Sequence, residues 1–282
     1  MAYPEPVRRE FFPADDGIRL SLLRSDPSSA TAASDPAILL VPGWCMPAAI
    51  WQPVLEALAP RHRVAALDPR GQGESAIPDA GYHIDQRADD LRLCIERLAP
   101  VVLVGWSLGA LEALQCLHRH GDRGIAGLAL VDSSVGEEPK PPPAAGFREG
   151  LLADRAAAMD RFVRSMFKTQ RPETEIAALI RASMQMPLES SLALFPAHLP
   201  REHWRDIARN VRVPLLYAVT AQFAGQAHNL ALARPGTRIE VFPDAGHALF
   251  VDEAHRFNRM LVDWVESECL QPQAGGPAPQ GS

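Results

Sequence analysis

The sequence predicts an α/β fold with a mostly parallel central sheet, helices on both faces, and a helical segment inserted between two halves of the core. From about residue 37 to residue 131, short apolar runs alternate with helical patterns, an alternation typical of a parallel sheet covered on both sides. A stretch with only helical patterns follows, from about 146 to 206. Strand patterns then return, so the helical stretch is an insertion.

An antiparallel hairpin is expected to open the fold. Asp15-Asp16-Gly17 separates the apolar runs 11–13 and 18–23, and Asp-Gly between two such runs favours a tight turn. The apolar spacing then predicts a strand at 37–41, a helix at 51–58, a strand at 63–67, a helix at 84–98, a strand at 101–105, a helix at 108–118 and a strand at 125–131.

The proline-rich segment 139–143 marks the start of the insertion, because it can continue neither a helix nor a strand. Beyond the insertion, strands are expected at 213–219 and 238–242 and a closing helix near 256–265. The final QPQAGGPAPQGS has almost no apolar residues and is expected to be disordered. The expected division is a core at 1–144 and 207–270, a helical cap at 145–206 and a tail at 271–282.

Composition excludes several classes of protein. The 282 residues carry 28 Lys+Arg against 34 Asp+Glu, a formal net charge of -6, which disfavours binding to nucleic acid. The apolar runs are far shorter than the roughly 20 residues of a membrane-spanning helix. The opening MAYPEPVRRE has no apolar stretch typical of a secretory signal, so we expect a cytoplasmic protein. The four cysteines lie far apart and are expected to be free thiols.

Gly105-Trp106-Ser107-Leu108-Gly109 matches the pattern Gly-x-Ser-x-Gly and lies between a predicted strand and a predicted helix. A serine at such a sharp turn takes a strained backbone conformation, and small flanking residues let the strand and the helix approach each other. The pentapeptide also occurs by chance, but this context favours a nucleophile. Ser107 is therefore the predicted nucleophile.

A serine hydroxyl needs a base beside it. Gly246-His247 lies beyond the last predicted strand and before the closing helix, where a chain order of nucleophile first and histidine last places the base. A plain surface histidine is the alternative. Two backbone N–H groups must also stabilise the oxyanion: we expect one from Leu108 and one from Trp44, although the Trp44 side chain could equally belong to the core or a pocket wall.

With Pro42-Gly43-Trp44 and Asp68 to Ser75, these motifs resemble the α/β-hydrolase superfamily over residues 10 to 268. Within it, Gly43-Trp44-Cys45, Trp51 and the amphipathic cap resemble carboxylesterases that act on the methyl ester of pimeloyl-acyl-carrier protein. Pro42 departs from the histidine that often precedes the glycine. The resemblance implies a hydrolase that needs no metal or cofactor, and a structural role for Arg70.

The acid that orients the histidine is not where most relatives carry it. Between Ile207 and Ile239 there is no Asp or Glu, and Gln222 or Phe223 aligns with the usual acid. Asp132, at the end of the preceding strand, is the best replacement, as in some haloalkane dehalogenases, whose chemistry Ser107 excludes. Asp132 could instead cap a turn. Asp244 is a poorer candidate, and Asp252 is expected to cap the closing helix.

In the cap, Met159, Phe162, Val163, Met166 and Phe167 follow helical spacing and predict one buried stripe. Arg161, Arg164 and Lys168 fall on the opposite face, which is usually only solvated. The resemblance implies that Arg161 and Arg164 could instead grip an acidic acyl carrier protein. The expected substrate-binding residues are Trp44, Trp106, Leu108, Phe162, Met166, Phe250, Arg161 and Arg164, whose apolar members suit an acyl chain.

The expected function is a serine carboxylesterase in which Ser107, His247 and Asp132 act together. The same fold could cleave a C–C bond or a lactone, or act as a cofactor-free perhydrolase. A receptor-like binding protein that has lost catalysis is the alternative from another class, because the fold alone does not decide function.

Overall fold

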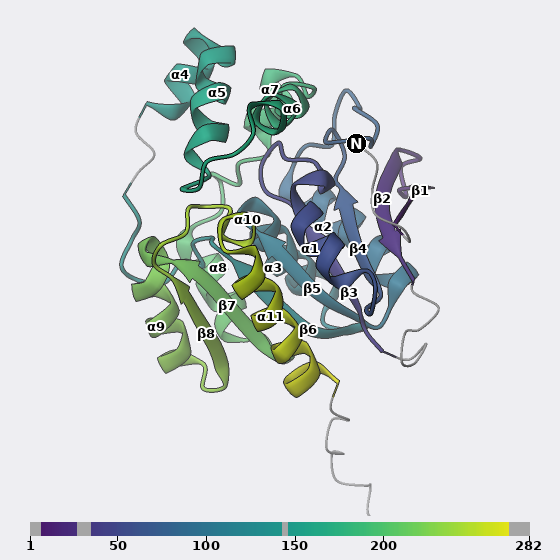
Figure 1. Cartoon of the computed structure of the whole chain (residues 1–282), viewed down its shortest axis with the longest axis vertical. Helices are drawn as coiled ribbons and strands as arrows, with labels where there is room; N and C mark the ends of the chain where they lie inside the picture. Colours follow the sequence, from purple (N-terminus) through teal and green to yellow (C-terminus); the bar gives the residue numbers. More distant parts are fainter. Residues whose placement is uncertain (1–6, 27–34, 143–145, 271–282) are drawn as a thin grey trace, which may run out of the picture.

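A computed structural model describes residues 7–26, 35–142 and 146–270. Within them, one sheet has the strand order β1-β2-β4-β3-β5-β6-β7-β8 (Figure 1). β1 and β2 pair antiparallel, as the Asp-Gly turn predicts, β2 also pairs antiparallel with β4, and the remaining pairs are parallel. The predicted α/β class is therefore confirmed. The strands are β1 (Arg8–Pro13), β2 (Arg19–Ser25), β3 (Ala37–Val41), β4 (Val64–Asp68), β5 (Val101–Trp106), β6 (Ile125–Val131), β7 (Leu215–Thr220) and β8 (Thr237–Phe242).

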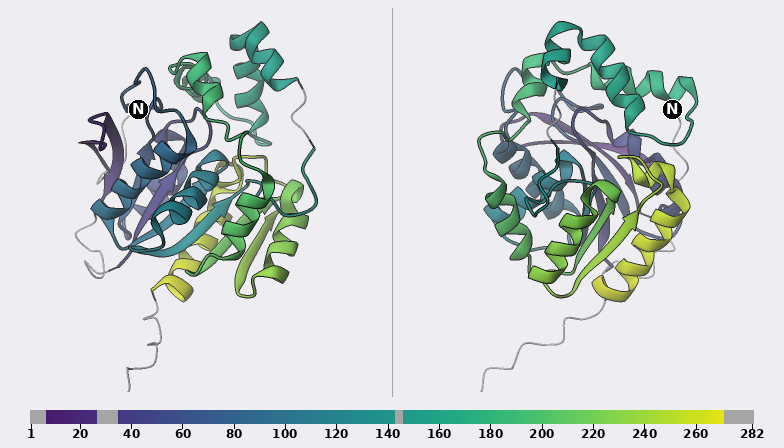
Figure 2. Two further views of the ribbon diagram at one scale, coloured as in Figure 1. Left: turned by 180° about the vertical axis from the view of Figure 1, so that it is seen from behind. Right: turned by 90° about the vertical axis from the view of Figure 1, so that its left-hand side faces the viewer.

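Helices cover both faces of the sheet (Figure 2). One face packs against α2 (Ile84–Leu98), α3 (Leu108–His120), α8 (Arg201–Arg209) and α9 (Ala224–Ala233). The other face packs against α1 (Gln52–Leu58), α10 (Leu249–Asp252) and α11 (Ala254–Trp264). Single turns η1 (Ala48–Trp51), η2 (Ala221–Phe223) and η3 (Val265–Cys269) join or extend these elements.

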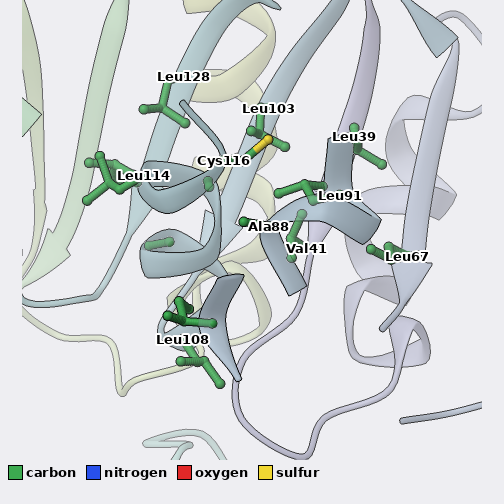
Figure 3. Close-up of a cluster of buried hydrophobic side chains, with 14 of the residues drawn as sticks. Leu39, Val41, Leu67, Ala88, Leu91, Leu103, Leu108, Leu114, Cys116 and Leu128 are labelled. Carbon is green, nitrogen blue, oxygen red and sulfur yellow. The ribbon is translucent and has the colours of Figure 1, made fainter. Parts of the chain in front are cut away.

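The central strands are buried on both faces, which explains their continuous apolar runs. In β3, Leu39 and Val41 point to the α2 and α3 side (Figure 3), whereas Ile38 and Leu40 point to the α1 and α11 side. All four are fully buried. Each such side chain stabilises the fold by about 1.5 to 3 kcal/mol relative to leaving it exposed.

The inserted segment forms α4 (Phe147–Ala153), α5 (Arg155–Ser165), α6 (Glu173–Ser183) and α7 (Leu188–Ala193), which lie together at one end of the molecule (Figure 1). The next helix, α8, packs against α3 beside the sheet. The boundaries of core and cap at 145 and 206 stay a prediction. The expected disordered tail at 271–282 lies outside the described residues, as does the N-terminal segment 1–6.

The state of the cysteines and the lengths of the helices can be compared with the expectations from composition. Cys45, Cys94, Cys116 and Cys269 are buried free thiols, as their spacing predicts. Among the described residues, no helix has both the length and the apolar character required to cross a membrane.

Candidate active site

Ser107 lies in the turn between β5 and α3. Its backbone has φ 56 and ψ −118, a conformation that costs an L residue of order 1 to 3 kcal/mol. Its side chain is partly accessible, whereas Trp106 and Leu108 on either side are buried. The strained turn thus leaves the one hydroxyl of the motif within reach of a ligand at the carboxyl end of β5.

The two glycines of the motif are required by close packing. A Cβ on Gly105 would lie 2.4 Å from the Gly109 carbonyl oxygen, and a Cβ on Gly109 would lie 2.6 Å from the carbonyl oxygens of Val41 and Pro42. These are backbone atoms, which cannot move without shifting β3 or α3. The approach of strand and helix predicted from the sequence is therefore present.

Gly109→Ala should destabilise the protein by about 1 to 3 kcal/mol, because the added methyl group overpacks the junction of β3 and α3. Gly150→Ala is the matched control: a Cβ there meets nothing closer than 3.8 Å, and alanine favours a helix interior. Urea unfolding curves of both variants measure the difference. Equal stabilities would contradict the packing argument.

His247 and Asp132 are joined directly. His247 Nδ1 lies 2.8 Å from Asp132 Oδ2, and the other carboxylate oxygen accepts a hydrogen bond of 2.7 Å from the backbone N–H of Thr220. Asp132 is 1% exposed and has φ 42, a left-handed conformation that Asp and Asn tolerate better than most residues. The carboxylate is thus held in one orientation, facing the ring nitrogen of His247.

The sheet order explains how Asp132 reaches the histidine. β6, which Asp132 follows, lies between β5 and β7, so the Ser107 turn and the Asp132 turn are neighbours at the same edge. The Asp132 N–H donates to Ala218 O in β7, and the Ser107 N–H donates to Val131 O in β6. Both turns are fixed by backbone bonds to the adjacent strand.

The other positions considered for the acid face elsewhere. Gln222 and Asp244 are exposed, and Phe223 is buried with an apolar ring. Asp252 was expected to cap the closing helix, but this expectation is wrong: the residue before α11 is Glu253, which makes no side-chain cap. The Asp252 carboxylate instead accepts hydrogen bonds from Gly246, Lys168 and Thr169.

His247 is held beside the Ser107 turn by Trp106. The indole Nε1 of Trp106 donates to the His247 carbonyl oxygen at 2.8 Å, and the two rings lie 5.0 Å apart between centroids. The described residues show no hydrogen bond between the Ser107 hydroxyl and the imidazole. Such bonds are often long in enzymes without substrate and tighten in the complex.

The two predicted oxyanion donors lie on loops that touch. Leu108 is the first residue of α3, so its N–H has no partner within the helix. A Cβ on Gly43, next to Trp44, would lie 3.0 Å from Ser107 Cβ, which shows how closely this loop approaches Ser107. Burial raises the pKa of the neighbouring Cys45 thiol to about 12, so this thiol is not a competing nucleophile at neutral pH.

Gln72 secures the Trp44 loop, a role that the sequence did not reveal. Its side-chain amide donates to Gly43 O at 3.1 Å and to Met46 O at 2.6 Å, and its Oε1 accepts from the buried Arg87. Gln72 belongs to the motif 68–75, but only the tertiary contacts show which member supports the site. Arg70 of the same motif is fully buried and pairs with Asp90 and Asp16, in line with a structural role.

The Trp44 side chain lies between the core and the helices of the inserted segment. Its ring meets Phe147 at 5.5 Å and Phe162 at 5.4 Å edge to face, and stacks on Phe195 at 5.2 Å. Its indole Nε1 donates to Ser191 O in α7 at 2.6 Å. The predicted oxyanion loop is therefore anchored to α4, α5 and α7 at once.

The predicted pocket residues separate into two groups. Phe250 is fully buried and stacks on Trp51 at 3.8 Å, and Met166 is 1% exposed; their role as pocket walls stays a prediction. Phe162 lines an opening of about 310 Å³ between α4 and α5, together with Arg161. Of the predicted set, these two residues border open space in the cap.

Arg161 and Arg164 are both exposed on α5 but differ in their partners. Arg164 makes hydrogen-bonded ion pairs with Asp160 and Glu173, and these bonds raise its pKa. Arg161 has no ion-pair partner among the described residues. Of these two arginines, Arg161 is therefore the one whose positive charge is not compensated by a described acidic residue.

Comparisons with known proteins agree with this architecture. Residues 38–260 match the model of the Alpha/beta hydrolase family. The pimeloyl-[acyl-carrier protein] methyl ester esterase of Vibrio cholerae is 29% identical over 81% of this chain and 93% of its own length, and that of Vibrio atlanticus is 28% identical over 82% and 95%. The crystal structure of an esterase from Exiguobacterium antarcticum aligns with a TM-score of 0.78 at 23% identity, covering 91% of this chain and 99% of that chain; this likeness concerns the fold.

Proposed function

Because the chain belongs to the alpha/beta hydrolase family, we propose that it is a serine carboxylesterase that works through an acyl-enzyme on Ser107. The bond between His247 Nδ1 and the buried Asp132 carboxylate carries this proposal. In a neutral imidazole this bond places the ring proton on Nδ1 and leaves Nε2 able to take a proton from a hydroxyl. A receptor-like protein would have no need for a charge buried in this orientation.

The proposed reaction has two steps, acylation of Ser107 and hydrolysis of the acyl-enzyme. The Ser107 oxygen bonds to the ester carbonyl carbon while its proton passes to His247 Nε2, and the carbonyl oxygen becomes an oxyanion facing the N–H groups of Leu108 and Trp44. The C–O bond to the alcohol then breaks, and the leaving oxygen takes the proton. A water molecule repeats the sequence on the acyl-enzyme and releases the acid and free Ser107.

The proposed substrate is an ester of an apolar acyl chain. Phe147 and Phe162 pack against the buried Trp44 ring and border the opening between α4 and α5, and apolar rings of this kind suit an alkyl chain. The curated relatives act on a methyl ester carried by an acyl carrier protein, so a carrier-linked methyl ester is the specific form that we propose. An acidic acyl carrier protein would contact the exposed, positively charged side chain of Arg161.

An activity-based label together with a substrate panel tests the proposal. A fluorophosphonate should modify the protein at Ser107, located by peptide mass spectrometry, and p-nitrophenyl esters of increasing acyl length should be hydrolysed. Panels of lactones, diketones and peracid-forming conditions distinguish the lactonase, C–C hydrolase and perhydrolase alternatives. A protein that is neither labelled nor active on any ester would be a binding protein, and the proposal would be wrong.

Arg161→Glu should lower kcat/KM for a carrier-linked methyl ester about tenfold at low salt, since an exposed charge acts mainly on association. Hydrolysis of p-nitrophenyl butyrate should stay unchanged. Arg164→Glu is the matched control, because Arg164 already has acidic partners on α5 and α6, and its effect should be smaller. Equal losses on both substrates would argue against a carrier contact.

A further inference from the structure

The loop that carries His247 is bound to the inserted segment as well as to the core. The linker between α5 and α6 lies against it: the Ala248 N–H donates to Met166 O at 2.9 Å, and the Lys168 ammonium donates to Pro243 O at 3.1 Å. A Cβ on Gly246 would lie 2.6 Å from Met166 O. Glycine at this position is what permits the contact.

Asp252 joins the two segments through one carboxylate. Oδ2 accepts from the N–H of Gly246 at 2.7 Å and of Lys168 at 2.8 Å, while Oδ1 accepts from the N–H of Thr169 at 3.1 Å and from its hydroxyl at 2.5 Å. Gly246 directly precedes His247, and the other two residues belong to the linker between α5 and α6. Partial burial raises the pKa of Asp252, but these donors outweigh it and hold the pKa below its ordinary value.

The Asp252 carboxylate therefore contributes to the position of the His247 loop. His247 is fixed at its carbonyl oxygen by Trp106 and at its ring by Asp132. At the residue before it, the Gly246 bond to Asp252 adds a further support, beside the Ala248 bond to Met166 O. A misplacement of about 1 Å in a reacting group can cost about 100-fold in rate, so this support bears directly on catalysis.

Resting on the function proposed above, we infer that Asp252 is a positioning residue, which aligns the His247 loop with Ser107 by tying it to the linker between α5 and α6. It touches no substrate and transfers no proton. The cap segment thus helps to set the geometry of the catalytic base, in addition to covering the site. The sequence pattern, which predicts a helix cap at Asp252, does not indicate this role.

Asp252→Asn tests the inference. The amide keeps the size of the side chain, but an NH₂ group replaces one of the two carboxylate oxygens. This NH₂ group cannot accept the two hydrogen bonds that the oxygen accepted, so that pair of bonds is lost. We expect kcat for p-nitrophenyl butyrate to fall 10- to 100-fold with KM within about twofold, and the rate of fluorophosphonate labelling to fall in parallel. Glu253→Gln, at the next residue, where the carboxylate pairs with Arg256, should leave kcat unchanged.

Two further measurements keep the result interpretable. Hydrogen exchange of the Gly246, Ala248 and Thr169 amides should quicken in Asp252→Asn while α3 stays protected, whether or not any ester is hydrolysed; an inactive wild type would thus count against the esterase and leave the loop contact testable. Thr169→Val removes one of the four donors and should cost about threefold in kcat with a small loss in Tm. A kcat for Asp252→Asn within threefold of the parent, or unchanged exchange at Gly246 and Ala248, would overturn the inference.

Discussion

Replacing Ser107 with alanine is expected to lower kcat for ester hydrolysis by about 10⁴- to 10⁶-fold, the range seen when the nucleophile of a serine hydrolase is removed. The variant keeps the oxyanion donors and the pocket but cannot form the acyl-enzyme. KM should change little, because binding does not depend on the hydroxyl. Steady-state kinetics with p-nitrophenyl butyrate measures the loss.

Circular dichroism and Tm separate this outcome from misfolding, and labelling tests the identity of the nucleophile. The strained turn of Ser107 accepts an alanine at the same backbone cost, so circular dichroism and Tm should match those of the parent. Ser267→Ala, in which a serine at the far end of the chain donates only to Trp264 O, is the control and should keep full activity and labelling. If Ser107→Ala still reacts with fluorophosphonate or hydrolyses esters at the parental rate, another residue is the nucleophile.

Asp132→Asn is expected to lower kcat by about 10⁴-fold through the tautomer of His247. The asparagine oxygen can keep the bond from Thr220 N–H, which leaves the NH₂ group facing His247 Nδ1 in place of Oδ2. A donor at that position requires Nδ1 to accept, so the proton moves to Nε2, where the imidazole can no longer take a proton from Ser107. The backbone of residue 132, at φ 42, tolerates asparagine, so folding should be preserved.

The control for this variant is Asp244→Asn, which changes an exposed carboxylate three residues before His247. Its turnover should equal that of the parent. Fluorophosphonate labelling of Asp132→Asn should slow in proportion to kcat. Turnover of Asp132→Asn within about threefold of the parent would mean that another group orients the histidine, and the assignment of Asp132 would fail.

The local sequence pattern accounts for most of the fold. Predicted and observed elements coincide at β3, α2 and β6, and the other predicted elements differ from the observed ones by a few residues; the strand predicted at 101–105, for instance, extends through Trp106. Apolar periodicity determines these elements because each buries its own face. The pattern did not predict α9 between β7 and β8. Helix ends are less predictable: α5 ends at Ser165, so Met166 and Phe167 leave the predicted stripe for the linker that meets the His247 loop.

Only part of the candidate site could be predicted from the sequence. Ser107 and His247 stand in local motifs, and the absence of acid after β7 pointed to Asp132, whose contact with His247 the structure contains at 2.8 Å. The catalytic roles of these residues stay predictions. Gln72 and Asp252 could not be assigned in this way, because the bonds of Gln72 to the Trp44 loop and of Asp252 to the linker between α5 and α6 join residues 26 to 84 positions apart, and no local spacing encodes such pairs.

The sequence by itself determined the alternation of strands and helices, the tight turn at Ser107 and the glycines beside it, because these depend on sterics and burial within a few residues. Only the tertiary structure decided which carboxylate meets His247, which of Arg161 and Arg164 has acidic partners, and that Asp252 holds the histidine loop to the linker between α5 and α6. Those outcomes depend on hydrogen-bond geometry between distant segments, where a shift of one ångström changes the partner.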